Sequence, residues 1–410
     1  MVSFLNEIAY SNLKLRKIVE IKLMDSKIKG ITTPPNRDEL SNRLEKVRNM
    51  MKDENLDYYV SFDPVNIYYL TNFANNVHER PFILIIEREG IPKMVVPLLE
   101  KSHVESRTLC ELDFYSYYEF PAPIGENWYD IYQPLIDNDK KVGIEAALPS
   151  GIADKTPGNK VITDIIDEIR IIKTNYEVGR SVHACKIINR GHKELLKMCK
   201  PRLHEFALYQ KITGSMTSKI ITDIPEANFI VCKTVAAVWP PSFSHDPHII
   251  PKIFAEMEEG GPHVSIVTAQ VDGYGVEIER TFFLGYVPEK AKKPFEVMFQ
   301  ARELAYSMLK PGTIMSEIDK KVRKFITEEG YGDYIIHRTG HGLGITGHEA
   351  PYLAEGYDRP LEPNMLISVE PGIYIPGLGG FRHSDSVLIT NEGYVKLTKA
   401  PEQLDDVIIV

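Results

Sequence analysis

The stretch Arg338-Thr339-Gly340-His341-Gly342-Leu343-Gly344-Ile345-Thr346-Gly347-His348-Glu349-Ala350-Pro351 places two histidines among four glycines. A glycine beside a histidine often marks only a turn. Other polar residues gather in four further short segments, namely Ser244-His245-Asp246-Pro247, residues 272–281, residues 368–372 and residues 379–385. Each segment alone could be a turn, a hairpin or a strand end. Their joint presence in one chain indicates a functional site.

The composition is that of a folded protein with two domains. The chain has 410 residues, of which 43% are hydrophobic and 26% charged, and this length exceeds one ordinary core. The net charge of −9 comes from interleaved acidic and basic residues, so no concentrated basic face is expected for a nucleic-acid partner. The four cysteines are scattered without a CxxC pair, which favours free thiols over disulfides or zinc.

The expected location is the cytoplasm. Residues 1–30 alternate apolar and charged side chains and lack the unbroken apolar run of a signal peptide. No other stretch approaches the length of a membrane span, so we expect no membrane partner.

The order of the predicted elements suggests where the domains meet. Residues 38–54 have helical spacing, and short extended runs then alternate with helices, which is typical of an α/β domain. Two amphipathic helices follow within 176–220, and two more between 288 and 329 separate groups of strands, as in an α+β domain. We predict domains over residues 1–173 and 174–410.

In this order and spacing, the five segments resemble the pita-bread superfamily of methionine aminopeptidase, proline aminopeptidase, prolidase and creatinase. The most specific matches are GYGVEIERTF (273–282), RTGHGLGITGHEAP (338–351) and SVEPGIY (368–374). Matching pieces run from about residue 36 to the C-terminus. The resemblance implies an α/β N-terminal domain, a larger pseudo-symmetric α+β pita-bread catalytic domain, and a homodimer.

The resemblance also assigns the metal ligands. Peptidases of this superfamily hold two divalent ions with two aspartates, one histidine and two glutamates. Carried over residue by residue, these ligands fall on Ile266, Glu277, His341, Glu370 and Ser384. Ile266 and Ser384 have lost the carboxylate, and Glu277 is one methylene longer. The sequence therefore predicts a site that works without a metal or another cofactor. The alternative is a single weakly held ion on Glu277, His341 and Glu370, with His383 assisting.

Creatinase, the metal-independent branch, offers the model for such a site. The resemblance assigns its proton-shuttling loop histidine to His245 and its guanidinium-binding glutamates to Glu279 and Glu370. An arginine from the partner subunit, which contacts the substrate carboxylate, falls on Arg80. His341 would steady the reacting water or the intermediate.

The carboxylate end of the creatinase site is less well matched. Its second carboxylate-binding arginine falls on Tyr352, and its partner-subunit phenylalanine falls on His78. His348 could assist at the site, although a structural hydrogen bond is the alternative. A surface ion pair is the alternative role for Arg80.

A charge argument independent of the resemblance supports a cationic substrate. Glu277 and Glu279 are two residues apart in a probable strand and so face the same way. With Glu370, three carboxylates would share one pocket and require a cation. A substrate guanidinium or amidinium offers forked donors to paired carboxylates. The alternative is that Glu279 pairs with Arg280 or another basic residue.

These observations predict a metal-independent, creatinase-like hydrolase that cleaves a C–N bond of a small guanidino or amidine compound, creatine-like or ectoine-like. One alternative is a metal-dependent Xaa-Pro dipeptidase or aminopeptidase, which would need Ile266 and Ser384 to be compensated. Another is a catalytically inactive pita-bread binding module. The predicted catalytic residues are His245, His341, Glu279 and Glu370, and the predicted substrate-binding residues are Arg80, Glu277, His348, Tyr352 and His78.

Overall fold

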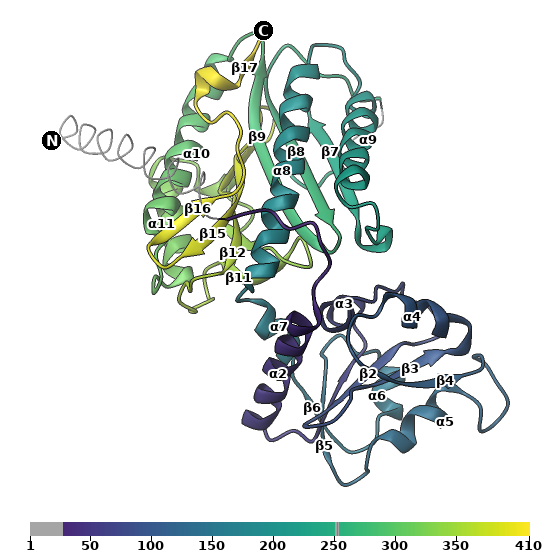
Figure 1. Cartoon of the computed structure of the whole chain (residues 1–410). Helices are drawn as coiled ribbons and strands as arrows, with labels where there is room; N and C mark the ends of the chain where they lie inside the picture. The colour runs from purple at the N-terminus through teal and green to yellow at the C-terminus, as the bar shows by residue number, and fades with distance from the viewer. Residues whose placement is uncertain (1–27, 251, 253) are drawn as a thin grey trace. The chain divides into compact units, whose positions relative to one another are not determined.

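The computed structural model of the chain describes residues 28–410 except 251 and 253 (Figure 1). The chain forms two compact units, Thr33–Arg170 and a larger unit of residues 28–32 with Ile171–Val410. The chain passes between the units after Arg170, and residues 28–32 belong to the larger unit rather than to the expected domain 1–173. Most of the N-terminal segment considered for a signal peptide lies outside the described residues.

The smaller unit is built around a six-stranded mixed sheet in the order β4-β3-β2-β1-β5-β6. Its strands are β1 (Tyr58–Ser61), β2 (Ile83–Glu87), β3 (Lys93–Pro97), β4 (Asp113–Tyr117), β5 (Lys141–Ile144) and β6 (Asn159–Ile162). Its helices are α2 (Arg37–Asp53), α3 (Pro64–Thr71), α4 (Lys101–Arg107), α5 (Trp128–Tyr132), α6 (Ser150–Lys155) and α7 (Ile165–Arg170). The predicted first helix is confirmed as α2. It begins where Asn36 accepts a hydrogen bond from the Glu39 amide at 2.8 Å.

The larger unit contains a nine-stranded sheet with the main order β11-β10-β12-β15-β9-β8-β7. Its strands are β7 (Lys233–Trp239), β8 (Gly260–Val271), β9 (Tyr274–Leu284), β10 (Gly340–Gly342), β11 (Glu349–Leu353), β12 (Leu366–Val369), β15 (Ser384–Thr390), β16 (Gly393–Lys396) and β17 (Ile408–Ile409). A separate antiparallel pair is formed by β13 (Gly372–Ile375) and β14 (Gly379–Arg382).

Two pairs of helices pack against this sheet system. The helices are α8 (Asn175–Met198), α9 (Glu205–Asp223), α10 (Glu289–Met308) and α11 (Met315–Glu328), at the positions expected from sequence. Helix α8 packs against β8 and β9, and α9 packs against β7 (Figure 1). Helix α10 contacts β12, and α11 contacts β11. A capping box between Thr174 and Glu177 starts α8.

The alternation along β8 determines which residues face the site. Val267 and Ala269 are buried in the core, whereas Ile266 and Thr268 are half-buried. A tight turn at Asp272 and Gly273 joins β8 to β9, and both residues have positive φ. The register pairs Ile266 with Glu279 and Thr268 with Glu277, so the two glutamates share the face of Ile266.

The cysteines and the helix lengths bear on the expectations of free thiols and of no membrane span. All four cysteines are free, as expected. Among helices in the described part of the chain, none combines the length and the hydrophobicity that a bilayer crossing requires.

Candidate active site

A cavity of about 470 Å³ in the larger unit collects most of the predicted site residues. Its volume suits a small molecule rather than a folded partner. The lining residues are mainly acids, imidazoles and arginines, namely Pro247, His248, Ile266, Glu277, Glu279, His337, Arg338, His341, His348, Glu370 and Arg382.

The imidazole of His341 lies between two buried carboxylates. Its Nε2 is 3.5 Å from Glu277 Oε1 and 3.2 Å from Glu370 Oε1. Nδ1 lies 3.0 Å from the carbonyl oxygen of Gly342, which can only accept, so Nδ1 carries a proton. Burial lowers the pKa of His341, but the two carboxylates outweigh this effect and raise it to about 10. The two carboxylates therefore favour a positively charged group, either a proton or a metal ion, at Nε2.

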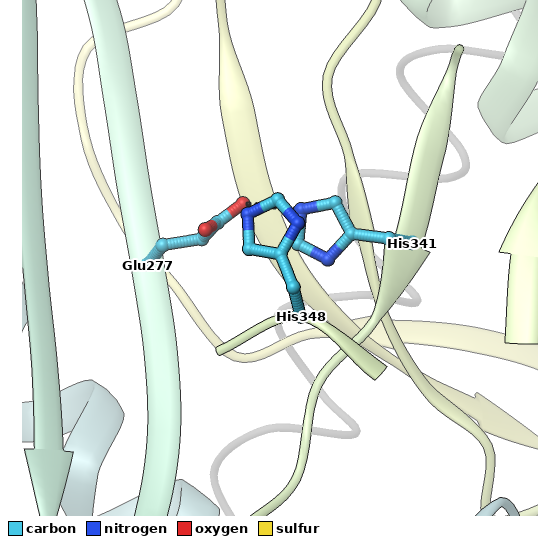
Figure 2. Close-up of side chains that lie close together, drawn as sticks. All are labelled: Glu277, His341 and His348. Carbon is cyan, nitrogen blue, oxygen red and sulfur yellow. Dashed lines mark ion pairs between the residues drawn. The ribbon is translucent and has the colours of Figure 1, made fainter. Parts of the chain in front are cut away.

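His348 completes a group that could hold a metal ion. One ligand atom each of Glu277, His341 and His348 lies within 4.8 Å of the others. Figure 2 shows the Glu277 carboxylate pointing toward the two rings, whose centroids are 3.7 Å apart in a stacked arrangement. Buried Nε2 of His341 has no hydrogen bond of good geometry within the described residues. Carboxylate and imidazole donors suit Mn, Co or Zn, so one ion fits here.

The third glutamate is neutralised by an arginine of the chain. Arg382 is 5% exposed, its Nη2 donates to Glu279 Oε1 at 2.5 Å, and its Nε lies 2.5 Å from Oε2. Burial alone would lower the pKa of Arg382, but the carboxylate of Glu279 raises this pKa by more. The guanidinium therefore stays charged. Arg280 pairs instead with Asp385 at 2.9 Å. The alternative of another basic partner for Glu279 is correct, so this glutamate needs no cationic group from a substrate.

The two positions expected to lack metal ligands are indeed without a carboxylate. Ile266 lines the cavity with no donor atom. Ser384 donates to Glu277 Oε1 at 3.1 Å, and its hydroxyl lies 2.9 Å from that of Ser368. The residues present therefore do not fit a two-ion centre, although Glu277, His341 and His348 fit a single ion.

The other predicted residues lie at different distances from this cluster. His245 belongs to the loop that contributes Pro247 and His248 to the cavity, but it is not itself among the lining residues. Tyr352 on β11 is the register partner of His341. The roles proposed for His245 and Tyr352 stay predictions.

His78 and Arg80 lie in the smaller unit. Arg80 Nε is 3.2 Å from Glu79 Oε1, and its Nη1 is 3.6 Å from Glu119 Oε2. Both are partly exposed ion pairs of the kind that contributes little to stability. The homodimer, and the reach of Arg80 across it, stay predictions.

Four polar lining residues received no role from the sequence: His248, His337, Arg338 and Arg382. His337 Nε2 lies 2.7 Å from the hydroxyl of Tyr374. The guanidinium of Arg338 stands 4.4 Å from the ring centroid of Tyr352. The sequence offered a signal for two of them, because Arg338 lies three residues before His341 and Arg382 lies two residues before Ser384.

Comparison with known proteins points to peptidases. The chain is 29% identical over 371 residues to the Xaa-Pro dipeptidase of Pyrococcus furiosus, covering 89% of this chain and 100% of the relative. It is 27% identical to the putative dipeptidase YkvY of Bacillus subtilis, covering 88% and 99%. The crystal structure of the prolidase from Pyrococcus horikoshii superposes with a TM-score of 0.76 at 26% identity, covering 88% and 99%.

The expectation of a metal-independent, creatinase-like amidinohydrolase is therefore wrong. Xaa-Pro dipeptidases and solved prolidases are similar to the chain over almost their whole length. The metal-free prediction gave too much weight to the two lost ligands. A cluster that could hold an ion persists at Glu277, His341 and His348, and Arg382 supplies the cation that was assigned to a guanidino substrate.

Family models match both parts of the chain. The Creatinase/Prolidase N-terminal domain matches residues 43–172. Metallopeptidase family M24 matches residues 181–391. These matches and the solved relatives confirm the expected fold, an α/β N-terminal domain with a pita-bread catalytic domain. The chain belongs to the metallopeptidase family M24.

Proposed function

We propose that the protein is a metal-dependent dipeptidase that hydrolyses Xaa-Pro dipeptides. The observation that carries this proposal is the cluster of Glu277, His341 and His348 inside a small cavity. It stands in a chain that matches an Xaa-Pro dipeptidase over the relative's full length. The cavity volume of about 470 Å³ agrees with a dipeptide-sized ligand.

The cluster would hold a divalent ion through Glu277, His341 and His348, with Glu370 beside them. Such an ion, when bound, supplies Lewis-acid chemistry and lowers the pKa of a water molecule. The Nδ1–H bond of His341 to the Gly342 carbonyl fixes the ring so that Nε2 faces the carboxylates. His341 is thus oriented as a ligand before any ion arrives.

The proton transfers are assigned to Glu370. Hydrolysis breaks the C–N bond before proline, joins the water oxygen to the carbonyl carbon, and delivers a proton to the leaving nitrogen. A buried carboxylate lining the cavity is placed to take the proton from the water and pass it on. His245, on the loop at the cavity, is kept as a second candidate for the final proton.

Arg338 is the proposed anchor for the substrate's free carboxylate. It lines the cavity, and no ion pair joins it to a carboxylate within the described residues. The ring of Tyr352 supports its guanidinium from one side. The resemblance placed an arginine at position 352, so the positive charge comes here from a neighbouring residue. An unpaired arginine in the pocket favours a dipeptide, whose carboxylate lies one residue from the scissile bond.

The test is hydrolysis of Ala-Pro by purified protein with Mn²⁺, and after exhaustive chelation. Cleavage with the ion, its loss on chelation and its return on Mn²⁺ addition are expected. Ala-Gly, a dipeptide without proline, tests whether cleavage requires the Xaa-Pro bond. Creatine tests whether guanidino compounds are substrates. The proposal would fall if Ala-Pro survives with each of Mn²⁺, Co²⁺ and Zn²⁺ while the protein stays folded.

A further inference from the structure

The structure arranges three residues of interest in one row across the sheet. On β8, β9 and β15, Ile266 is the register partner of Glu279, and Ser384 is its partner on the other side. Directly paired residues of antiparallel strands project to the same face. The two positions expected to carry a two-ion centre, 266 and 384, therefore flank Glu279.

None of the three side chains in this row is available to a second ion. Ile266 has no donor atom, and Ser384 donates its hydroxyl to Glu277 at 3.1 Å. The carboxylate of Glu279 has both oxygens 2.5 Å from nitrogens of Arg382. A ligand was thus lost on each side of Glu279, and the carboxylate that remains is committed to an internal cation.

Charge balance leads to the same conclusion. The cavity holds three buried carboxylates, on Glu277, Glu279 and Glu370, and one buried guanidinium, on Arg382. The guanidinium pairs with Glu279, and His341 would give up its Nε2 proton to a bound ion, which leaves two negative charges at Glu277 and Glu370. One divalent ion neutralises these two charges, whereas a second would add two uncompensated positive charges beside Arg382.

We propose that the centre holds one divalent ion per chain, bound at Glu277 and His341, and that the Glu279–Arg382 pair replaces the second ion of related two-ion peptidases. The proposal rests on the metal dependence of the proposed function and specifies its stoichiometry. Arg382 acts as a positioning residue, because it holds Glu279 away from the ion.

The experiment counts Mn²⁺ ions bound to the full-length protein by native mass spectrometry, with isothermal titration calorimetry as the second readout. The wild-type chain is expected to bind one ion. The double variant Ile266→Asp/Ser384→Glu restores both lost carboxylates and is expected to bind two. The matched control Ile266→Asn/Ser384→Gln has nearly the same side-chain shapes without the charge and is expected to stay at one.

Two ions on the wild-type chain would overturn the proposal, and so would none. A folded Asp/Glu double variant that still binds one ion would also overturn it. If that variant does not fold, the wild-type count still decides. One ion without Ala-Pro cleavage would leave this inference standing and remove the proposed function, whereas two ions with cleavage would do the reverse.

Discussion

Two buried acidic centres of the larger unit balance their charge in different ways. In the Asp385 centre, the fully buried carboxylate of Asp385 accepts hydrogen bonds from Arg280 at 2.9 Å, Thr398 at 2.7 Å and Tyr306 at 3.2 Å, and also from Arg302. Every charge there has a partner within the protein. A centre closed in this way stabilises the fold and has no capacity for a ligand.

The cavity cluster, which comprises Glu277, Glu279, Glu370, His341 and Arg382, is balanced only in part. Arg382 satisfies Glu279, while Glu277 and Glu370 share the single imidazole of His341. The cluster also borders a cavity rather than packed core. The comparison shows that buried carboxylates become a site where internal cations are too few, and the predictions below test this difference.

The largest expected effect is on stability, at the Asp385 centre. Asp385→Asn leaves the guanidinium groups of Arg280 and Arg302 buried without their counter-charge. The free energy of unfolding should fall by about 3–5 kcal/mol, measured by urea denaturation. Glu277→Gln is the matched control, an equally conservative change at a buried carboxylate, and should cost far less in chelator. Equal losses in the two variants would erase the distinction between the centres.

Next in size is the loss of ion binding in the cavity cluster. Glu277→Gln keeps the shape of the side chain but removes a charged ligand. The affinity for Mn²⁺, measured by calorimetry, should fall by at least about 100-fold, and Ala-Pro cleavage should fall with it. The control Glu317→Gln changes an exposed carboxylate on α11 and should leave both unchanged. Unaltered Mn²⁺ affinity in Glu277→Gln would remove this residue from the ligand set.

The free energy of unfolding, measured over a pH series, should show that the carboxylates around the Asp385 centre are paired with internal cations. Burial raises the pKa of neighbouring Glu402, but Arg302 and Lys396 outweigh it and lower the pKa to about 2. Its contribution to stability is therefore complete above its ordinary pKa of about 4.3 and is lost as the pH falls toward 2.

Between these values, each such group should steepen the decline by up to about 1.4 kcal/mol per pH unit. Urea denaturation in chelator from pH 7 to pH 3 measures the slope. Glu402→Gln should make the slope shallower by the part that proton uptake at this one carboxylate contributes. An unchanged slope in that variant would show that Glu402 does not couple to folding.

The smallest effect is expected at the substrate anchor. Arg338→Gln should raise KM for Ala-Pro by roughly tenfold with little change in kcat, because a charge-assisted hydrogen bond is lost. Ala-Pro amide, which lacks the carboxylate, is the matched substrate and should show no such difference between wild type and variant. An equal loss on both substrates would assign Arg338 a structural role.

The sequence was sufficient to predict the two-domain fold and most of the cavity cluster. Glu277, Glu279, His341, His348 and Glu370 occur in short segments whose spacing predicted one site, and they do line one cavity. Helical periodicity is a local feature, so the helices were predicted well.

The partner of Glu279 could not be predicted from local patterns. Arg382 is 103 residues away along the chain, and the contact depends on the register of strands that meet only in the folded sheet. Counting carboxylates without their partners overestimated the unbalanced charge, and that error led to a cationic substrate. Arg338 escaped notice for a similar reason, because its support is a ring on another strand.

The most direct test of the whole account is the anomalous scattering of manganese in crystals of the wild-type protein grown with Mn²⁺. The account predicts one anomalous peak in the cavity, within bonding distance of Glu277 and His341, and an intact Glu279–Arg382 pair beside it. Two peaks bridged by carboxylates, or no peak at all in crystals that cleave Ala-Pro, would contradict it.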